Sequence, residues 1–203
     1  NDRNEYGAQP NTNVSPITLG HPGTLPKMNK KTIDFAIKMG IACESEIAEL
    51  QHFARKNYFY PDLPKGYQIT QDTTPICTGG KVLIKDANGN DKYIGVTRIH
   101  MEEDAGKSIH DIDPFNTLID LNRAGVPLIE IVSEPDMSSA DEAVTFGKEV
   151  RDICRFLGVT GGIMQRGHMR FEPNINLVIT TDDGSEHATP IVEVKNLNSF
   201  KAL

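Results

Sequence analysis

The sequence predicts an α+β fold in which helices flank an antiparallel β-sheet. Segments 82–103 and 170–196 each alternate apolar and polar residues on either side of a Gly-containing turn, which is the pattern of a β-hairpin. Two further segments carry apolar residues at helical spacing behind an N-cap residue. The chain has 203 residues, enough for the apolar faces of both hairpins and both helices to close one core.

The first part of the chain contributes one helix and two irregular segments. Residues 1–28 are rich in Pro, Asn and Gly without periodicity, which indicates a loop. Asn29 is the predicted N-cap of a helix whose apolar face is formed by Ile33, Ile37 and Ile41. Residues 53–80 are loop-like again and contain many aromatic side chains, which is typical of loops that pack tightly or bind something.

The strands of the predicted sheet come next. In the first hairpin, residues 82–85 and 93–103 form strands joined by a turn at Asn88-Gly89. A third strand covers residues 127–133. The second hairpin pairs residues 170–179 with residues 190–196.

The second helix lies between the third strand and the second hairpin. Residues 139–142 read SADE, a capping box that opens a helix, and Gly158 is the predicted end. The apolar stripe of this helix consists of Val150, Ile153, Cys154 and Leu157.

Composition excludes several classes of protein. The net charge of −7 argues against a domain that wraps nucleic acid, although a site that grips only the end of one stays possible. No apolar run reaches the ~20 residues of a membrane helix, and no signal peptide is visible. Three widely spaced cysteines give no disulfide framework and suit a reducing cytosol, so we expect a cytoplasmic protein.

The strand faces carry the candidate chemistry, because successive side chains point to opposite sides of a strand. Arg98, His100 and Glu102 share one face of the long strand. Arg170 and Glu172 share a face in the second hairpin, as do Glu193 and Lys195. Two interpretations remain open at this point: a functional surface, or the solvated face of a half-exposed antiparallel sheet.

Glu130 interrupts an apolar run, LIEIV at 128–132, that is typical of a buried strand. A buried carboxylate must be paired, hydrogen-bonded or bound to a metal. Glu130 is therefore either part of a structural salt bridge to Arg123 or Arg98, or a ligand for a hard cation such as Mg²⁺.

Two shorter clusters also have both a structural and a functional interpretation. The adjacent acids at 102–104 repel one another; they are solvated, or supply a metal ligand beside Lys107. Residues 55–58 read RKNY, a basic and aromatic cluster that also suits a compact surface turn. The sequence contains no HExxH zinc motif, no Walker loop, no GxGxxG after a strand and no GxSxG elbow.

Four long sequence motifs are more specific indicators of a protein family than any of these patterns. They read RKNYFYPDLPKGYQI at 55–69, TRIHMEEDAGK at 97–107, DLNRAGVPLIEIVSEPD at 120–136 and VKNLNSF at 194–200. Each closely resembles a signature of the B subunits of the aspartyl/glutamyl-tRNA(Asn/Gln) amidotransferases, and together the resemblance spans nearly the whole chain.

The resemblance implies that residues 1–203 are a catalytic cradle domain, related to the glutamine synthetase and guanido kinase folds. It implies an ATP-dependent, glutamine-hydrolysing ligase that phosphorylates the side-chain carboxylate of Glu-tRNA(Gln) or Asp-tRNA(Asn), and displaces phosphate with ammonia. The ammonia would come from a glutaminase A subunit, and a small C subunit would complete a heterotrimer. A non-catalytic module that only docks the glutaminase is the alternative.

Residue roles follow from the resemblance position by position. Glu103 and Glu130 are expected to bind Mg²⁺ around one site facing a cleft, and Lys56 and Tyr58 to lie near the mouth of the ammonia path. The residues expected to line the cradle are Arg98, His100, Lys107 and Arg170 as catalytic groups, and Lys195, Asn196 and Asn198 as groups that bind the ATP cofactor.

The chain also departs from the family pattern. Ser15 and Thr18 stand where many members carry a Cys-x-x-Cys pair, so we expect no zinc. Glu172 stands where members usually have Asp. The family's N-terminal strand, with a Glu and a His that help hold metal, and its C-terminal helical and tail domains are absent, so we expect the isolated chain to be inactive.

Overall fold

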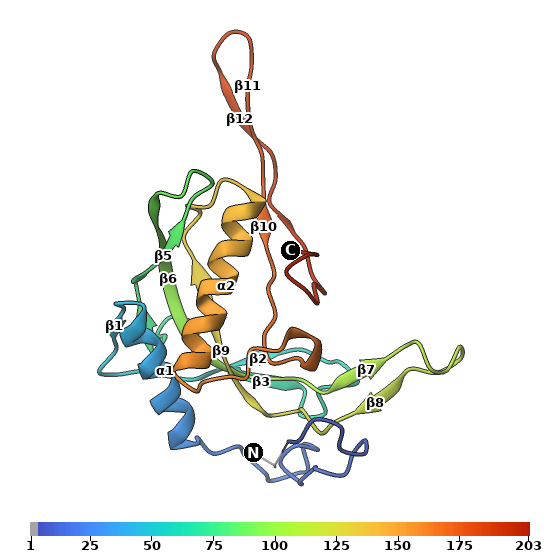
Figure 1. The fold of residues 1–203 in the computed structure, drawn as a ribbon. Helices are drawn as coiled ribbons and strands as arrows, with labels where there is room; N and C mark the ends of the chain where they lie inside the picture. Colours follow the sequence, from blue (N-terminus) through green and yellow to red (C-terminus); the bar gives the residue numbers. More distant parts are fainter. Residues whose placement is uncertain (1–3) are drawn as a thin grey trace. The chain divides into compact units, whose positions relative to one another are not determined.

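The computed structural model describes residues 4–203, which form two compact units (Figure 1). Unit 1 combines the segment that ends at Lys81 with Gly95–Asp136, and unit 2 combines Val82–Ile94 with Met137–Leu203. The chain therefore crosses between the units three times. Within the described residues, no helix has the length and apolar character needed to cross a membrane.

Unit 1 is built around an antiparallel sheet whose central strand is β6 (Asp91–Glu103). β6 pairs with β4 (Cys77–Thr78) and with β9 (Pro127–Ser133), and β4 pairs with β1 (Glu46–Ile47). The prediction of an α+β fold with an antiparallel sheet is confirmed, and so is the predicted strand at 127–133.

Helix α1 (Lys30–Ala42) packs against β1, β4 and β9. Asn29 caps it as predicted, since its side chain accepts a hydrogen bond from the Lys31 backbone N–H. Of the predicted isoleucine face, Ile33 and Ile37 are half-buried, whereas Ile41 is 65% exposed. The buried face instead carries smaller and more flexible side chains that allow a close approach to the sheet: Ala36, Met39, Gly40 and Cys43.

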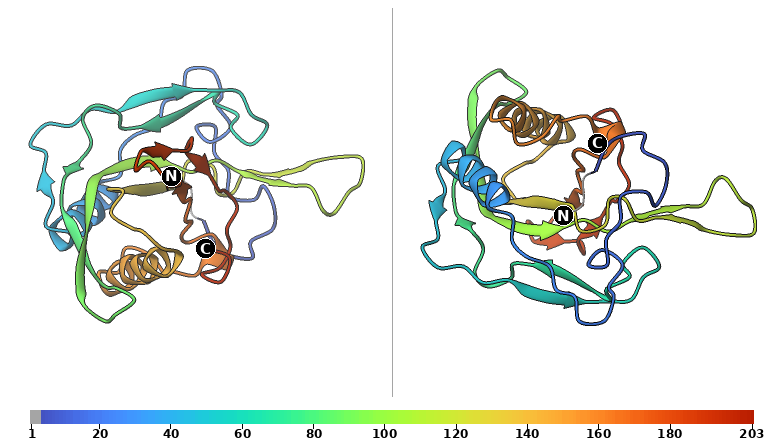
Figure 2. Two further views of the ribbon diagram at one scale, coloured as in Figure 1. Left: turned by 90° about the horizontal axis from the view of Figure 1, so that it is seen from above. Right: turned by 90° about the horizontal axis from the view of Figure 1, so that it is seen from below.

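Two further hairpins belong to unit 1. The first joins β2 (Ala54–Asn57) to β3 (Tyr67–Thr70), and the second joins β7 (Lys107–Ile109) to β8 (Leu118–Asp120). Figure 2 shows β7–β8 reaching away from the other strands of its unit. The expectation of a loop at 53–80 missed β2, β3 and β4, because backbone pairing there does not need alternating apolar side chains.

Unit 2 contains the turn of the first hairpin and helix α2. β5 (Lys81–Lys85) pairs with β6 as predicted. α2 (Ala140–Phe156) begins behind Ser139, whose hydroxyl accepts from the Glu142 N–H at 3.2 Å, and Gly158 follows it in the left-handed conformation at φ 70°. Val150 and Cys154 are buried, whereas Ile153 and Leu157 are half-buried.

The second hairpin is present but largely unburied. β10 (Asn174–Ile175) pairs with β13 (Val192–Glu193), and β11 (Val178–Thr180) pairs with β12 (Glu186–Ala188). The expectation that its apolar face closes a common core is wrong: Leu177 is 63% exposed. These strands pair only with each other among the described residues, so no further strand extends them into a larger sheet.

Candidate functional site

The register between β6 and β9 assembles a polar cluster in unit 1. His100 lies directly opposite Glu130, so the two side chains share a face of the sheet, and Glu102 joins them two residues further along β6. His100 Nε2 lies 3.3 Å from Glu102 Oε1 and 3.8 Å from Glu130 Oε2. We name His100, Glu102 and Glu130 the strand cluster.

The three side chains of the strand cluster differ in exposure. The side chain of His100 is 5% exposed, that of Glu102 12% and that of Glu130 51%. The expected burial of Glu130 is therefore wrong. β9 pairs with β6 alone among the described strands, and an edge strand leaves its side chains partly open to water. The cluster accordingly has a buried floor and one accessible carboxylate.

The salt bridge considered for Glu130 is absent from the described residues. Arg123 Nε lies 3.2 Å from Asp104 Oδ2 instead, and its guanidinium also donates to the carbonyls of Ala105 and Gly106. Arg98 lies opposite Val132, on the same face as His100. Among residues 4–203, Glu130 thus has no arginine partner and stays available to a ligand.

Glu102 is held from two directions. Thr70 Oγ1 donates to Glu102 Oε1 at 2.6 Å, and Gln68 Nε2 lies 3.4 Å from Oε2. Burial opposes ionisation of Glu102, but hydrogen bonds from His100 and Thr70 and electrostatic attraction to His100 and Lys56 outweigh it and lower the pKa of Glu102. Glu102 is an anion at neutral pH.

Glu103 lies on the opposite face of β6 from Glu102 and Glu130. Its carboxylate forms a buried ion pair with Lys65 and accepts from the Ile69 N–H at 3.1 Å. The predicted approach of Glu103 to Glu130 around one cation is therefore not observed. One residue along a strand reverses the direction of a side chain, so Glu102 takes the position expected for Glu103.

The neighbouring acids do not repel one another on a common surface. Glu102 bonds to Thr70, Glu103 to Lys65, and Asp104 to Arg123. Each carboxylate therefore has its own donor, and only Glu102 belongs to the strand cluster. The alternation of side chains along 98–102 was the sequence signal that could have identified it.

Lys56 and Tyr58 belong to the β2–β3 hairpin. Contacts that involve side chains join this hairpin to β6 within unit 1. Gln68 Nε2 donates to the Glu103 carbonyl at 2.7 Å, and Lys56 Nζ lies 6.0 Å from the Tyr58 ring centroid. Burial raises the pKa of Tyr58, and the nearby carboxylates, Glu102 among them, raise it further. Tyr58 is a neutral phenol near the strand cluster.

The remaining predicted site residues are distributed over both units. Lys107 is exposed at the start of β7, opposite Asp120. Arg170, Lys195, Asn196 and Asn198 belong to unit 2, where all four are exposed. Lys195 Nζ lies 3.2 Å from Glu193 and 3.3 Å from Glu172, and these two carboxylates raise its pKa.

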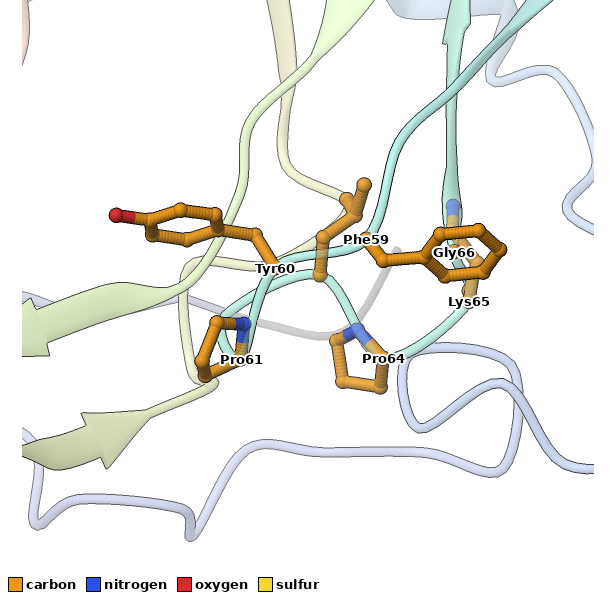
Figure 3. A pocket seen from close by; sticks show the side chains of 7 residues that line it. Phe59, Tyr60, Pro61, Pro64, Lys65 and Gly66 are labelled. Carbon is orange, nitrogen blue, oxygen red and sulfur yellow. The ribbon is translucent and has the colours of Figure 1, made fainter.

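An open pocket lies in the loop after β2, lined by Phe59, Tyr60, Pro61, Leu63, Pro64, Lys65 and Gly66. Figure 3 shows the rings of Phe59 and Tyr60 pointing to opposite sides of the loop. The side chain of Lys65 is only 6% exposed, and its ammonium group is bound to Glu103. The pocket therefore offers a largely apolar surface whose one cation is already paired.

Comparison with known proteins decides the family. The model of the GatB/GatE catalytic domain matches residues 1–203, the whole chain. This chain belongs to that family. The chain is 50% identical over 202 residues to the B subunit of the aspartyl/glutamyl-tRNA(Asn/Gln) amidotransferase of Borreliella burgdorferi strain ZS7, which covers 99% of this chain and 41% of that protein.

Two further relatives carry similar names. The chain is 52% identical over 201 residues to the B subunit of the Finegoldia magna aspartyl/glutamyl-tRNA(Asn/Gln) amidotransferase, covering 99% of this chain and 41% of that protein. It is 50% identical over 201 residues to the B subunit of the chloroplastic/mitochondrial glutamyl-tRNA(Gln) amidotransferase of Sorghum bicolor, covering 98% and 36%. The chain spans about two fifths of the length of these curated relatives.

The GatB/GatE catalytic domain of this chain offers one group suited to a cation. Among residues 4–203, the strand cluster is the set of three metal-ligating side chains whose ligand atoms all lie within 4.8 Å of one another. Two carboxylates fit Mg²⁺, which takes one or two from protein and keeps water for the rest. Buried His100 Nδ1 has no hydrogen-bond partner in the described part of the chain. This nitrogen of the strand cluster can therefore still form a hydrogen bond.

The position expected to lack zinc lies in the N-terminal loop of unit 1. The hydroxyls of Ser15 and Thr18 lie 3.2 Å apart and hydrogen-bond to each other. They supply neutral oxygens rather than the thiolates that structural zinc sites use.

Proposed function

We propose that this chain is the catalytic part of a B subunit that amidates Glu-tRNA(Gln), Asp-tRNA(Asn) or both. The substrate carboxylate oxygen attacks the γ-phosphorus of ATP and ADP leaves; ammonia then attacks the acyl carbon and phosphate leaves. A carboxylate is a poor electrophile, and the phosphate makes it one. The relatives' names, which specify tRNA amidotransferase subunits, support this proposal.

The strand cluster is the observation that carries the proposal. A half-exposed carboxylate stands beside a buried imidazole and a second, hydrogen-bonded carboxylate. Glu102 and Glu130 would hold Mg²⁺, which when bound supplies positive charge to the phosphate oxygens during phosphoryl transfer. His100 would orient the Glu102 carboxylate through Nε2, which lies 3.3 Å from Glu102 Oε1 and 3.8 Å from Glu130 Oε2. No cation role is assigned to Glu103, whose carboxylate is occupied by Lys65.

The other residues of the chain are assigned by position. Lys56 and Tyr58, beside the strand cluster, would border the path of ammonia; the neutral phenol can accept or donate one hydrogen bond without attracting ammonium. Arg98 shares the face of His100 and would meet the anionic substrate, as would Lys107. The proposed ATP contacts are three exposed polar groups of unit 2: Lys195, Asn196 and Asn198. Arg170, also exposed in unit 2, keeps its proposed catalytic role.

Partners and compartment follow from the same proposal. Ammonia would come from a glutaminase A subunit, with a small C subunit completing a heterotrimer, and the substrate would be the acceptor end of the mischarged tRNA. We propose a cytoplasmic location without bound zinc. All three cysteines are free and buried, which fits a reducing compartment, and burial raises the pKa of Cys43 and Cys77 to about 11.

The alternative is a non-catalytic module that docks the glutaminase. That alternative predicts a sealed structural ion pair at Glu130. The carboxylate is half-exposed and has no arginine partner within residues 4–203, which favours the catalytic proposal.

The test uses the full-length protein with its partner subunits, ATP, Mg²⁺, glutamine and Glu-tRNA(Gln) or Asp-tRNA(Asn). We expect ATP hydrolysis that depends on the mischarged tRNA and formation of the amidated tRNA. The E130Q variant should lose both while glutamine hydrolysis by the partner is still detectable. Undiminished amidation by E130Q would support the docking alternative and overturn the proposal.

A further inference from the structure

Thr70 supplies the shortest hydrogen bond to the strand cluster from outside the main sheet. Thr70 ends β3, its side chain is buried, and its hydroxyl donates to Glu102 Oε1 at 2.6 Å. The same carboxylate oxygen lies 3.3 Å from His100 Nε2. Oε1 is thus held between a residue of β3 and a residue of β6, while Gln68 Nε2 lies 3.4 Å from Oε2.

The bond matters because of where β3 lies in the topology. β3 pairs with β2 and with no strand of the main sheet among the described residues. The hairpin that carries Lys56 and Tyr58 is therefore joined to β6 through side chains, at Glu102, Glu103 and Gln71. Gln71 Oε1 accepts from the Met101 N–H at 3.0 Å. Two of these links reach the strand cluster, both at Glu102. The bond from Thr70, at 2.6 Å, is shorter than the contact from Gln68, at 3.4 Å.

We infer that Thr70 is a positioning residue for the cation site: its hydroxyl holds the Glu102 carboxylate in the orientation that faces His100 and Glu130. The inference rests on the proposed function, because it takes Glu102 and Glu130 as the cation ligands. Residues that orient a ligating carboxylate commonly change metal affinity by roughly 10- to 100-fold when removed. A second consequence is that the Lys56–Tyr58 hairpin and the cation site share this hydrogen bond.

The experiment measures the binding of Mn²⁺, used as the probe ion, to the full-length protein in its complex with the partner subunits and without ATP. Binding is followed by the loss of the electron paramagnetic resonance signal of the free ion. T70V keeps the shape of the side chain and removes the hydroxyl, and T70S keeps the hydroxyl. We expect T70V to raise the Mn²⁺ dissociation constant roughly 10-fold or more. T70S should bind with nearly the unaltered affinity.

The chain offers a matched control in the same unit. Thr97 Oγ1 donates to Glu134 Oε1 at 2.7 Å, a threonine–glutamate bond of similar length outside the strand cluster. T97V should leave Mn²⁺ affinity unchanged. Thermal unfolding without metal is measured for every variant, because a purely structural role of Thr70 predicts a lower unfolding temperature with unaltered affinity.

The outcomes separate this inference from the proposed function. If T70V binds Mn²⁺ like the unaltered protein while E102Q does not, the role of Thr70 is refuted and the cation site stands. If E102Q and E130Q also bind normally, the cation site of the proposed function fails as well. Should T70V fail to fold, T70A replaces it as the variant without the hydroxyl. T70A should then bind Mn²⁺ roughly 10-fold or more weakly than T70S at the same temperature, and equal affinities would refute the role of Thr70.

Discussion

Glu102 and Glu103 are adjacent in β6, yet their carboxylates serve opposite faces of the strand. Glu102 bonds to Thr70 and His100 on the side of Glu130, whereas Glu103 bonds to Lys65 and the Ile69 N–H. Between them they attach the β2–β3 hairpin to the central strand. The Glu102 carboxylate therefore lies beside Glu130, where a cation could bind. The Glu103 carboxylate is buried, and its charge is paired with that of Lys65.

The first prediction separates these two acids by metal affinity. E102Q and E130Q should each weaken Mn²⁺ binding by more than the roughly 10- to 100-fold typical of residues that only support ligands, because each removes a charged ligand. E103Q should bind Mn²⁺ with nearly unaltered affinity. Equilibrium binding to the full-length protein provides the measurement, and equal losses in E102Q and E103Q would contradict the assignment.

The second prediction concerns the ion pair of Lys65 and Glu103, whose side chains are 6% and 9% exposed. K65M leaves the Glu103 carboxylate buried without its cation and should cost roughly 3–5 kcal/mol of folding stability. The double variant K65M/E103Q removes that charge and should recover part of the loss. Thermal unfolding of the single and double variants measures the coupling; simple additivity of the two losses would show that the pair contributes nothing as a pair.

The third prediction tests the close approach of α1 to the sheet. A Cβ on Gly40 would overlap Cys77 Sγ and lie 2.6 Å from Ile47 Cδ1. G40A should therefore destabilise the protein by about 1–3 kcal/mol, even though alanine favours a helix over glycine by about 1 kcal/mol. Adding C77A should relieve the overlap and restore part of the stability. A G40A protein that unfolds at a higher temperature would show that α1 has room to move away.

The fourth prediction is a pH dependence at Tyr58. Its pKa is raised above the ordinary 10.0, chiefly by burial and then by nearby carboxylates. The neutral phenol therefore persists to higher pH in the folded chain than in the unfolded chain, and folding loses stability as the pH rises from 10.0 toward the folded value. The difference in tyrosinate absorbance between the unaltered protein and Y58F should have its midpoint above pH 10.0.

A control for this prediction uses Glu102, one of the carboxylates that raise the pKa of Tyr58. E102Q removes one of the negative charges that raise this pKa, so the Tyr58 midpoint should fall in E102Q. A midpoint that stays unchanged would mean that Glu102 and Tyr58 do not interact.

The sequence by itself determined the local elements whose signals are local. Asn29 begins α1, the Asn88-Gly89 turn joins β5 to β6, and β9 covers Pro127–Ser133, because caps, turn residues and side-chain alternation act within a few residues. The long motifs also determined the family, which the match over residues 1–203 confirms.

Only the tertiary structure decided which side chains meet. Whether Glu102 or Glu103 joins Glu130 depends on the register between β6 and β9, and a shift of one residue would exchange the two. The exposure of Glu130 depends on β9 being an edge strand, and the pairing of Thr70 with Glu102 depends on where the β2–β3 hairpin docks. These contacts join segments distant in sequence, and the free energy that selects them comes from packing and hydrogen bonding between elements, which no local pattern records.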